Sequence, residues 1–423
     1  MKREKAAVGV KKTNALIAAS LLLYMSTLCI KILYSAEAVM LLSALSETKA
    51  RVGFGLTLYY LCYAVLQIVL YIVMPRLRMK PYLTVTLALS AVGFALVPFC
   101  GALWQIWVLM GLMGFLQAGT VGGLMHFLGL YVPKERMGAV CRYMAAGLAL
   151  GTAFAYVLGS LFVFLGAWRL SFVLMAAVHF PLLAWLWRLL SREERREARA
   201  DAADASGVGT PDSFTPEDTA PSAPPSVAPR GIRLPRALLL CALLACIFSI
   251  AYYGLSGWFP TLLKESFGFQ DAYSVLLSAL LPLVSAVGPV ACFALCDRRG
   301  RAHFQTGLWL YLPAVLLSLL MLLLYRLNGI LTLVMAVLLI LFVKGVSGIY
   351  ATYIPAHSKD KTAIGRSVAL INAFSALGAS VAPTLAGSII DKGGYDGLFL
   401  LMLALALLTL LLSALGAWTE RDK

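Results

Sequence analysis

Apolar runs of about twenty residues alternate with short polar segments along most of the chain. A helix rises 1.5 Å per residue, so a run of roughly twenty residues crosses the hydrocarbon core of a bilayer. The pattern predicts an all-α integral membrane protein with twelve spans. They cover residues 14–39, 52–74, 82–103, 104–131, 139–165 and 169–190, and then 236–262, 272–296, 304–325, 330–354, 364–389 and 397–418.

A polar stretch divides these spans into two sets of six. The predicted organisation is an N-terminal half over 1–190, a cytoplasmic linker over 191–235, a C-terminal half over 236–418 and a short tail over 419–423. The linker begins with a charged segment that is compatible with a helix. It continues as a Pro-, Ser- and Ala-rich segment typical of flexible linkers.

The composition agrees with a membrane protein, since 61% of residues are hydrophobic and only 13% are charged. The first apolar run is too long for the core of a signal peptide and lacks a convincing small-residue cleavage site, so we interpret it as a retained span. The eight cysteines lie in or beside apolar runs, without the spacing of a metal site, and are assigned to packing. No cofactor or metal is predicted.

The net charge of +15 follows the predicted topology. If the N-terminus is cytoplasmic, 27 of the 35 Lys and Arg residues lie in cytoplasmic segments and six lie outside. This bias predicts that both termini are cytoplasmic. The basic excess is therefore a topology signal and does not indicate a nucleic-acid partner. The predicted location is a bacterial cytoplasmic (inner) membrane, with the lipid bilayer as surroundings and the chain as a monomer.

Lys31 and Lys344 are the two basic residues left over, because both fall inside apolar runs. A charge at that depth costs roughly 2.5 to 3.5 kcal/mol on insertion scales and usually faces a water-filled path. Tyr24 and Tyr34 share the helical face of Lys31. The alternative is that Lys31 snorkels to the surface or pairs with Glu37, although a separation of six residues is poor for a same-face pair.

Lys344 lies deep in the tenth predicted span, and no Asp or Glu lies in the middle of any span. One lysine therefore comes from each half. Two deep cations from opposite halves predict an anion clamp. The alternative is that Lys344 belongs to a structural ion pair.

The segment CDRRGRAHF, between the eighth and ninth spans, resembles the Asp-Arg-x-Gly-Arg loop of the major facilitator superfamily, as does the arrangement of six spans, linker and six spans. The resemblance implies a cytoplasmic latch that includes Asp297, Arg298 and Arg301. In the first half, MPRLRMKPY has Pro75 where the acid of that loop is expected. The alternative for these charges is a solvated basic loop.

Within the superfamily the chain most resembles the organophosphate:phosphate antiporters, through GFGLTLYYLCYAVLQIVLYIVMPR, VPKERMG, YYGLSGWFPTLLKESFGF and SVALINAFSALGASVAPTLAGSIIDKGGYDGLF. The resemblance implies substrate-binding positions on several spans, and in part with changed residue types. Lys31 replaces an arginine, Gln67 a lysine, Tyr252 a second arginine and Lys344 a tyrosine, while Tyr24 and Tyr63 keep tyrosines and His126 lies about a turn before the family histidine.

These changes alter the predicted substrate class. Arginine offers a forked pair of donors that fits phosphate, whereas lysine is a point charge that suits carboxylates at least as well. We therefore expect a secondary transporter of a small organic anion, a carboxylate or a phosphate ester, that works by alternating access. Gln117 stands where related anion:proton symporters carry an acid, which favours exchange or facilitated diffusion over proton symport.

Two alternatives to this function remain: a proton-coupled anion symporter, and a transporter-like sensor of an external anion. No catalytic set is visible, so an enzyme is not expected. Weaker candidates for substrate contact are polar residues of the inner spans, each of which is also a candidate for helix packing. They are Gln117, His126, Tyr253 and Asn372.

Overall fold

The computed structural model describes residues 2–73, 77–205, 236–299, 303–356 and 361–421, and every regular element within these ranges is helical. Helices before residue 206 are called here the N-terminal half. They are α1 (Lys2–Ala36), α2 (Ala38–Leu45), α3 (Lys49–Val73), α4 (Met79–Leu96), η2 (Val97–Phe99), α5 (Leu103–Gln117), α6 (Thr120–Tyr131), α7 (Lys134–Phe164) and α8 (Trp168–Ala205).

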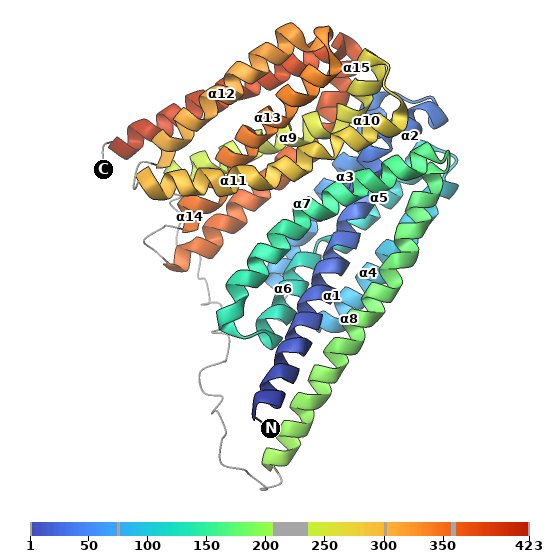
Figure 1. Cartoon of the computed structure of the whole chain (residues 1–423), viewed down its shortest axis with the longest axis vertical. Helices are drawn as coiled ribbons and strands as arrows, with labels where there is room; N and C mark the ends of the chain where they lie inside the picture. The colour runs from blue at the N-terminus through green and yellow to red at the C-terminus, as the bar shows by residue number, and fades with distance from the viewer. Residues whose placement is uncertain (1, 74–76, 206–235, 300–302, 357–360, 422–423) are drawn as a thin grey trace.

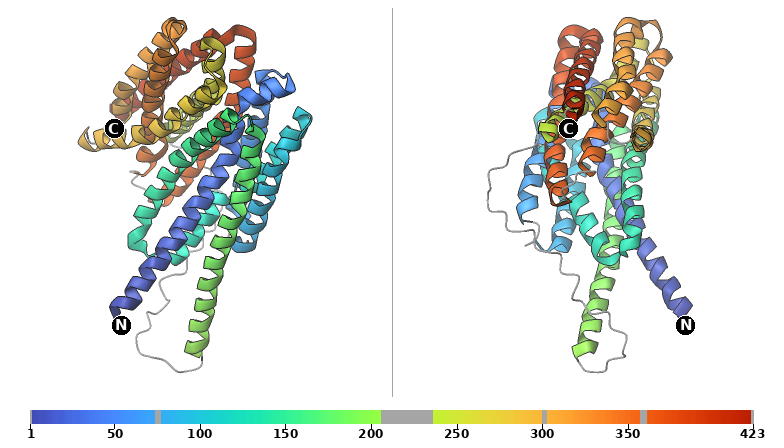
Figure 2. Two further views of the ribbon diagram at one scale, coloured as in Figure 1. Left: turned by 45° about the vertical axis from the view of Figure 1, so that its right-hand side comes forward. Right: turned by 90° about the vertical axis from the view of Figure 1, so that its left-hand side faces the viewer.

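The helices after residue 235 form the C-terminal half. They are α9 (Arg236–Phe267), α10 (Asp271–Ser278), α11 (Leu280–Arg299), α12 (His303–Leu324), η4 (Tyr325–Leu327), α13 (Gly329–Gly348), η5 (Ile349–Tyr353), α14 (Ile354–Ala356) and α15 (Lys361–Arg421). The two halves lie side by side near α2 and the beginning of α3, and they diverge toward the ends that carry the chain termini (Figures 1 and 2).

The predicted spans correspond to these helices in order. Ten described helical segments are long and apolar enough to cross a membrane. One of them, Leu370–Trp418, covers the eleventh and twelfth predicted spans, which meet at Gly394. The φ of 64° at Gly394 lies in the left-handed region, where glycine has no steric cost, so the chain turns there. The second predicted span corresponds to α3, which is not among the ten, and the count of twelve stays a prediction.

The helices and the predicted spans differ in some details. The first span is not continuous to residue 39, because α1 ends at Ala36 and α2 starts at Ala38, with Glu37 between them. The fourth and eighth predicted spans agree with the candidate spans Leu103–Tyr131 and Asp271–Arg298, although the helix is interrupted inside them after Gln117 and after Ser278. In the other direction, α8 continues through the charged part of the predicted linker to Ala205. The rest of that linker lies outside the described residues.

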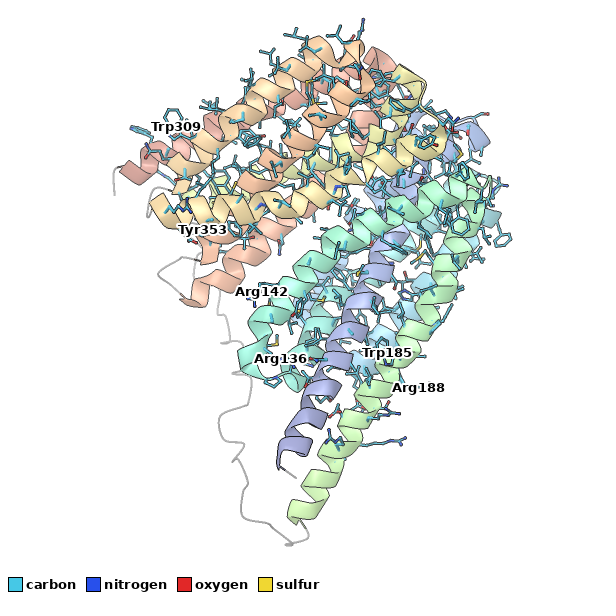
Figure 3. All side chains as sticks on the ribbon, viewed as in Figure 1. Arg136, Arg142, Trp185, Arg188, Trp309 and Tyr353 are labelled. Carbon is cyan, nitrogen blue, oxygen red and sulfur yellow. The ribbon has the colours of Figure 1, made fainter. Side chains whose placement is uncertain are left out.

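The outer surface of the bundle carries large apolar side chains. Val290, Leu323 and Leu411 are each more than half exposed. Trp309 points outward from α12, as Figure 3 shows. An exposed apolar surface of this extent is unfavourable in water and favourable in lipid, which agrees with the spans identified from hydropathy.

Glycines let helices of the bundle approach backbone to backbone. A methyl group on Gly114 of α5 would lie 2.1 Å from the carbonyl oxygen of Tyr59 on α3. A methyl group on Gly288 of α11 would lie 2.3 Å from the carbonyl oxygen of Leu341 on α13. Membrane helices rely on such close packing, because lipid supplies little hydrophobic driving force between them.

This packing predicts that Gly114→Ala destabilises the protein, because the new methyl group forces α3 and α5 apart. Overpacking typically costs about 1 to 3 kcal/mol, so the midpoint of thermal unfolding in detergent should fall by several degrees. Gly129→Ala is the matched control, since Gly129 is also helical and a methyl group there meets no atom within 4 Å. Equal midpoints for the two variants would contradict the close contact.

Candidate functional site

Lys31 on α1 and Lys344 on α13 lie at similar depth in opposite halves. Roughly 20 Å of helix separates Lys31 from the end of α2, and a similar length separates Lys344 from the start of α13. Both side chains are half-buried, and the two positive charges lie near enough to repel each other. Neither ammonium group has a carboxylate within ion-pair distance in the described part of the chain.

Each ammonium group rests on the face of a tyrosine ring. Lys31 Nζ is 5.3 Å from the ring centroid of Tyr60, and Lys344 Nζ is 4.1 Å from that of Tyr252. The negative face of an aromatic ring attracts a cation within about 6 Å, and the attraction grows when water is excluded. The tyrosine faces therefore replace the missing carboxylates in part.

Five tyrosines are in contact with one another, and three of them, Tyr60, Tyr253 and Tyr252, link the two lysines. We call the five the tyrosine row: Tyr59, Tyr60, Tyr63, Tyr252 and Tyr253. The ring centroids of Tyr60 and Tyr253 are 5.0 Å apart, as are those of Tyr252 and Tyr253. Tyr59 lies edge-on to Tyr60 and stacks on Tyr63. Since α3 carries three of these rings and α9 carries two, the row joins the two halves.

The position of Lys344 is fixed by close contact between α11 and α13. A methyl group on the neighbouring Gly345 would lie 2.6 Å from Sγ of Cys292 and 3.0 Å from the carbonyl oxygen of Gly288. Immediately beyond, η5 is a π-helical turn. Such turns are rare in proteins, and those that occur are often found at functional sites.

Two amide side chains support the row from the N-terminal half. Tyr59 donates a hydrogen bond of 2.7 Å to Oε1 of Gln117, whose Nε2 donates to Oγ of Ser90 at 2.7 Å. Gln67 Nε2 donates to the Tyr63 hydroxyl at 3.0 Å. Gln117 is buried, and its two hydrogen bonds connect α5 with α3 and α4. It is therefore a positioning residue for Tyr59.

Other predicted site residues lie elsewhere or at the edge of this group. Tyr24 is near Tyr63 and Tyr253, so the structure brings it to the row. Tyr34 is fully buried and donates to the Val52 carbonyl oxygen at 2.7 Å, so its hydroxyl ties α1 to α3. His126 is exposed and its ring contacts its neighbour Phe127, while Asn372 is exposed on α15. No described contact joins these last three residues to the row.

Sequence reasoning does not single out Tyr59 and Tyr60. The signal that points to Tyr60 is its spacing of three residues from Tyr63 and seven from Gln67, which places all three on one helical face. The contact of Tyr60 with Tyr253 has no counterpart in sequence spacing. Residues of two halves that are far apart in the chain meet there.

The halves are held together at one end by α3 and α15. The backbone N–H groups of Lys49 and Ala50, at the start of α3, donate to the two carboxylate oxygens of Asp391 at 3.2 and 2.8 Å. Lys49 Nζ is 3.1 Å from Oε1 of Glu265, which also belongs to the C-terminal half. We call this end of the molecule the closed end.

Close backbone contact continues inward from Asp391. A methyl group on Gly53 would lie 2.6 Å from the Pro383 carbonyl oxygen, and one turn later Thr57 Oγ1 donates to the Ser380 carbonyl oxygen. On the other side of the interface, Ser160 of α7 donates to the Ala272 carbonyl oxygen at 2.7 Å. The contacts between halves thus involve α3 with α15 and α7 with α10.

The polar contacts described at the opposite end stay within a half. Asp297 accepts a hydrogen bond from the hydroxyl of Tyr353, and both belong to the C-terminal half. Figure 3 labels Tyr353 there. Arg136 donates to Asn14 within the N-terminal half. Arg298 is exposed and Arg301 lies outside the described residues. The predicted latch therefore has one described bond, from Asp297 to its own half.

Half-buried cations from two helical halves, deep in an apolar bundle, are typical of membrane proteins with a water-filled substrate path. The model of the Major Facilitator Superfamily matches residues 16–363. The chain belongs to this superfamily.

Similar proteins agree with the superfamily assignment. NicT of Pseudomonas putida, described as a candidate metabolite transport protein, is 22% identical over 380 residues, which cover 84% of this chain and 81% of that protein. Two crystal structures of a bacterial homologue of the human lysosomal transporter Spinster have the same fold. The unoccupied inward-facing form has a TM-score of 0.73 and covers 97% of each chain, and the occupied inward-facing form has 0.69 and covers 96% of each, both at 14% identity.

These similarities support a multi-pass membrane transporter. The narrower resemblance to organophosphate:phosphate antiporters stays a prediction.

The contact between Asp391 and α3 predicts that Asp391→Ala loosens the closed end. Hydrogen bonds to a charged acceptor contribute about 1.5 to 3 kcal/mol, so amide hydrogen exchange at the start of α3 should become at least about tenfold faster. Asp396→Ala is the control, because Asp396 pairs with Arg326 and Tyr325 inside the C-terminal half. Unchanged exchange at residues 49–50 in Asp391→Ala would show that the closed end does not depend on this carboxylate.

Proposed function

We propose that the protein is a secondary transporter of a small organic anion and that Lys31 and Lys344 bind the anion together. The observation that carries the proposal is the pair of half-buried ammonium groups, one from each half, without a described carboxylate partner. A single anion between them would lower the net charge of the site and offset the repulsion between the two ammonium groups. The proposed setting is a bacterial cytoplasmic membrane, with both termini in the cytoplasm.

The chemistry of the two lysines favours carboxylates. Ammonium groups are compact point charges, whereas phosphate is usually held by forked arginine donors. The described residues of the tyrosine row and its surroundings include no arginine. The Tyr63 hydroxyl accepts from Gln67 and keeps its own proton to donate, so it adds a neutral donor that suits a carboxylate without demanding a second charge.

Alternating access is supported by the fact that the two proposed anion-binding lysines belong to different halves. Lys31 moves with the N-terminal half and Lys344 with the C-terminal half, so an anion that binds both changes the relative energy of arrangements of the halves. A ligand shifts such an equilibrium only through different affinity for the two states. Midplane sites at the junction of two repeats work in this way in many transporters.

We further propose that transport is exchange or facilitated diffusion. In the described residues no carboxylate contacts the lysines or the tyrosine row. Gln117, at the position of a family acid, is engaged in two hydrogen bonds of 2.7 Å. Neither side chain partner of Gln117 is an acid, so this position lacks the proton-carrying group that a symporter would use.

Proton-coupled symport is the second candidate, and Glu37 favours it. This carboxyl group is fully buried at the break between α1 and α2. Ser171 donates to its Oε1 at 2.7 Å, while its Oε2 has no hydrogen-bond partner among the described residues. A buried carboxyl with one unsatisfied oxygen is a group that can take up a proton.

The lysine pair predicts that Lys31→Met and Lys344→Met each weaken anion binding at least about thirtyfold, because truncating one member of a buried charge pair typically costs 2 kcal/mol or more. Binding and anion exchange would be measured in proteoliposomes. Lys80→Met is the control, because Lys80 pairs with Glu194 within one half. A variant that folds and keeps its affinity removes that lysine from the site.

Exchange without protons predicts that an imposed proton gradient does not drive accumulation of labelled anion, while the same anion inside the vesicles stimulates uptake. Glu37→Gln keeps the acceptor for Ser171 and removes the titratable group, so it should leave both behaviours unchanged. Accumulation that follows the proton gradient in the natural protein and disappears in Glu37→Gln would establish symport through Glu37.

A further inference from the structure

We infer that the anion is a planar aromatic carboxylate, selected by the tyrosine row. This inference rests on the proposed anion site and narrows its substrate class. It starts from the fact that an aromatic ring lies next to each of the two charges.

The faces next to the lysines belong to one group of contacts. The Lys31 ammonium group lies over the ring of Tyr60, and that ring contacts Tyr253. Tyr253 in turn contacts Tyr252, whose ring lies under the Lys344 ammonium group. A small anion whose charge lies at either ammonium group is therefore bound next to an aromatic ring.

The geometry of the row suits a flat ring. Tyr59 and Tyr63 are nearly parallel, at 16°, whereas Tyr252 and Tyr253 meet edge to face at 79°. Offset stacking and edge-to-face contact are the two arrangements that aromatic pairs prefer. Both arrangements occur within one group of side chains, and its half-buried members, Tyr63 and Tyr253, are the rings that a substrate ring can reach without rearrangement.

The charge of the lysines also fits this substrate. Each ammonium group is now held by a cation–π contact, which a carboxylate would replace with a stronger charge-assisted hydrogen bond. The ring face released by the lysine then becomes available to the ring of the substrate. A saturated substrate of equal charge makes the same contact with the ammonium group. It cannot make an aromatic contact with the tyrosine face that the lysine has left.

The test compares benzoate with cyclohexanecarboxylate, which carries the same charge on a ring of similar size that is neither planar nor aromatic. Binding to the full-length protein in nanodiscs would be measured by calorimetry. We expect benzoate to bind at least about fivefold more tightly, since each aromatic pair adds stability beyond area burial. Tyr60→Phe should keep this ratio, because the ring face remains, and Tyr60→Leu should bring it close to one.

The outcomes separate the inference from the proposed function. Equal affinities of the natural protein for the two acids, with binding that is lost in Lys31→Met, would overturn the aromatic preference and leave the anion site intact. Phenyl phosphate that binds more tightly than benzoate would overturn the carboxylate. Absence of binding and of exchange with every member of this panel would overturn both the inference and the proposed anion site.

Discussion

Two ammonium groups in an apolar bundle, supported by tyrosine faces instead of carboxylates, set the main constraint on this molecule. A lysine at that depth costs roughly 2.5 to 3.5 kcal/mol on insertion scales. A cation–π contact returns about 0.5 to 2 kcal/mol, depending on how well water is excluded. The cation–π contact therefore offsets only part of the insertion cost of each lysine, and the repulsion between the two ammonium groups adds to that cost. Packing elsewhere must therefore keep both charges in place, which is what a binding site for an anion requires.

That packing is made largely by residues without side-chain bulk. Gly345 lets α13 approach α11 beside Lys344, and Gly114 lets α5 approach the backbone of Tyr59. At the closed end, Gly53 and the Asp391 contact hold α3 against α15. The same helix α3 thus carries part of the tyrosine row and part of the interface between halves. A change in the angle between the halves must also move the rings of α3 relative to those of α9.

The apolar runs and the two lysines inside them could be predicted from the sequence. Features that depend on residues far apart in the chain could not. Apolar runs locate the helices, and the two lysines stand out because a charge there is expensive. The break at Glu37 is hidden, because the apolar run continues through it. Tyr60 gains its meaning from Tyr253, a residue of the other half, and no local spacing encodes that contact. Tyr34 shares the face of Lys31 by spacing, yet its hydroxyl is used by the backbone of α3.

The lysine pair also bears on why exchange is the more natural mode under the proposed function. A carrier that returns empty must pass through a state in which both ends are closed around the two ammonium groups. Without an anion, that state contains two desolvated like charges and no counter-charge, which raises its free energy by several kcal/mol. With a monocarboxylate bound, the net charge of the same site falls from +2 to +1, and both ammonium groups have a counter-charge beside them. Each kcal/mol of this difference slows the empty return about fivefold relative to the loaded step. Under the proposed function, the cost of an empty site therefore couples the movement of one anion to that of another, and this coupling needs no proton relay.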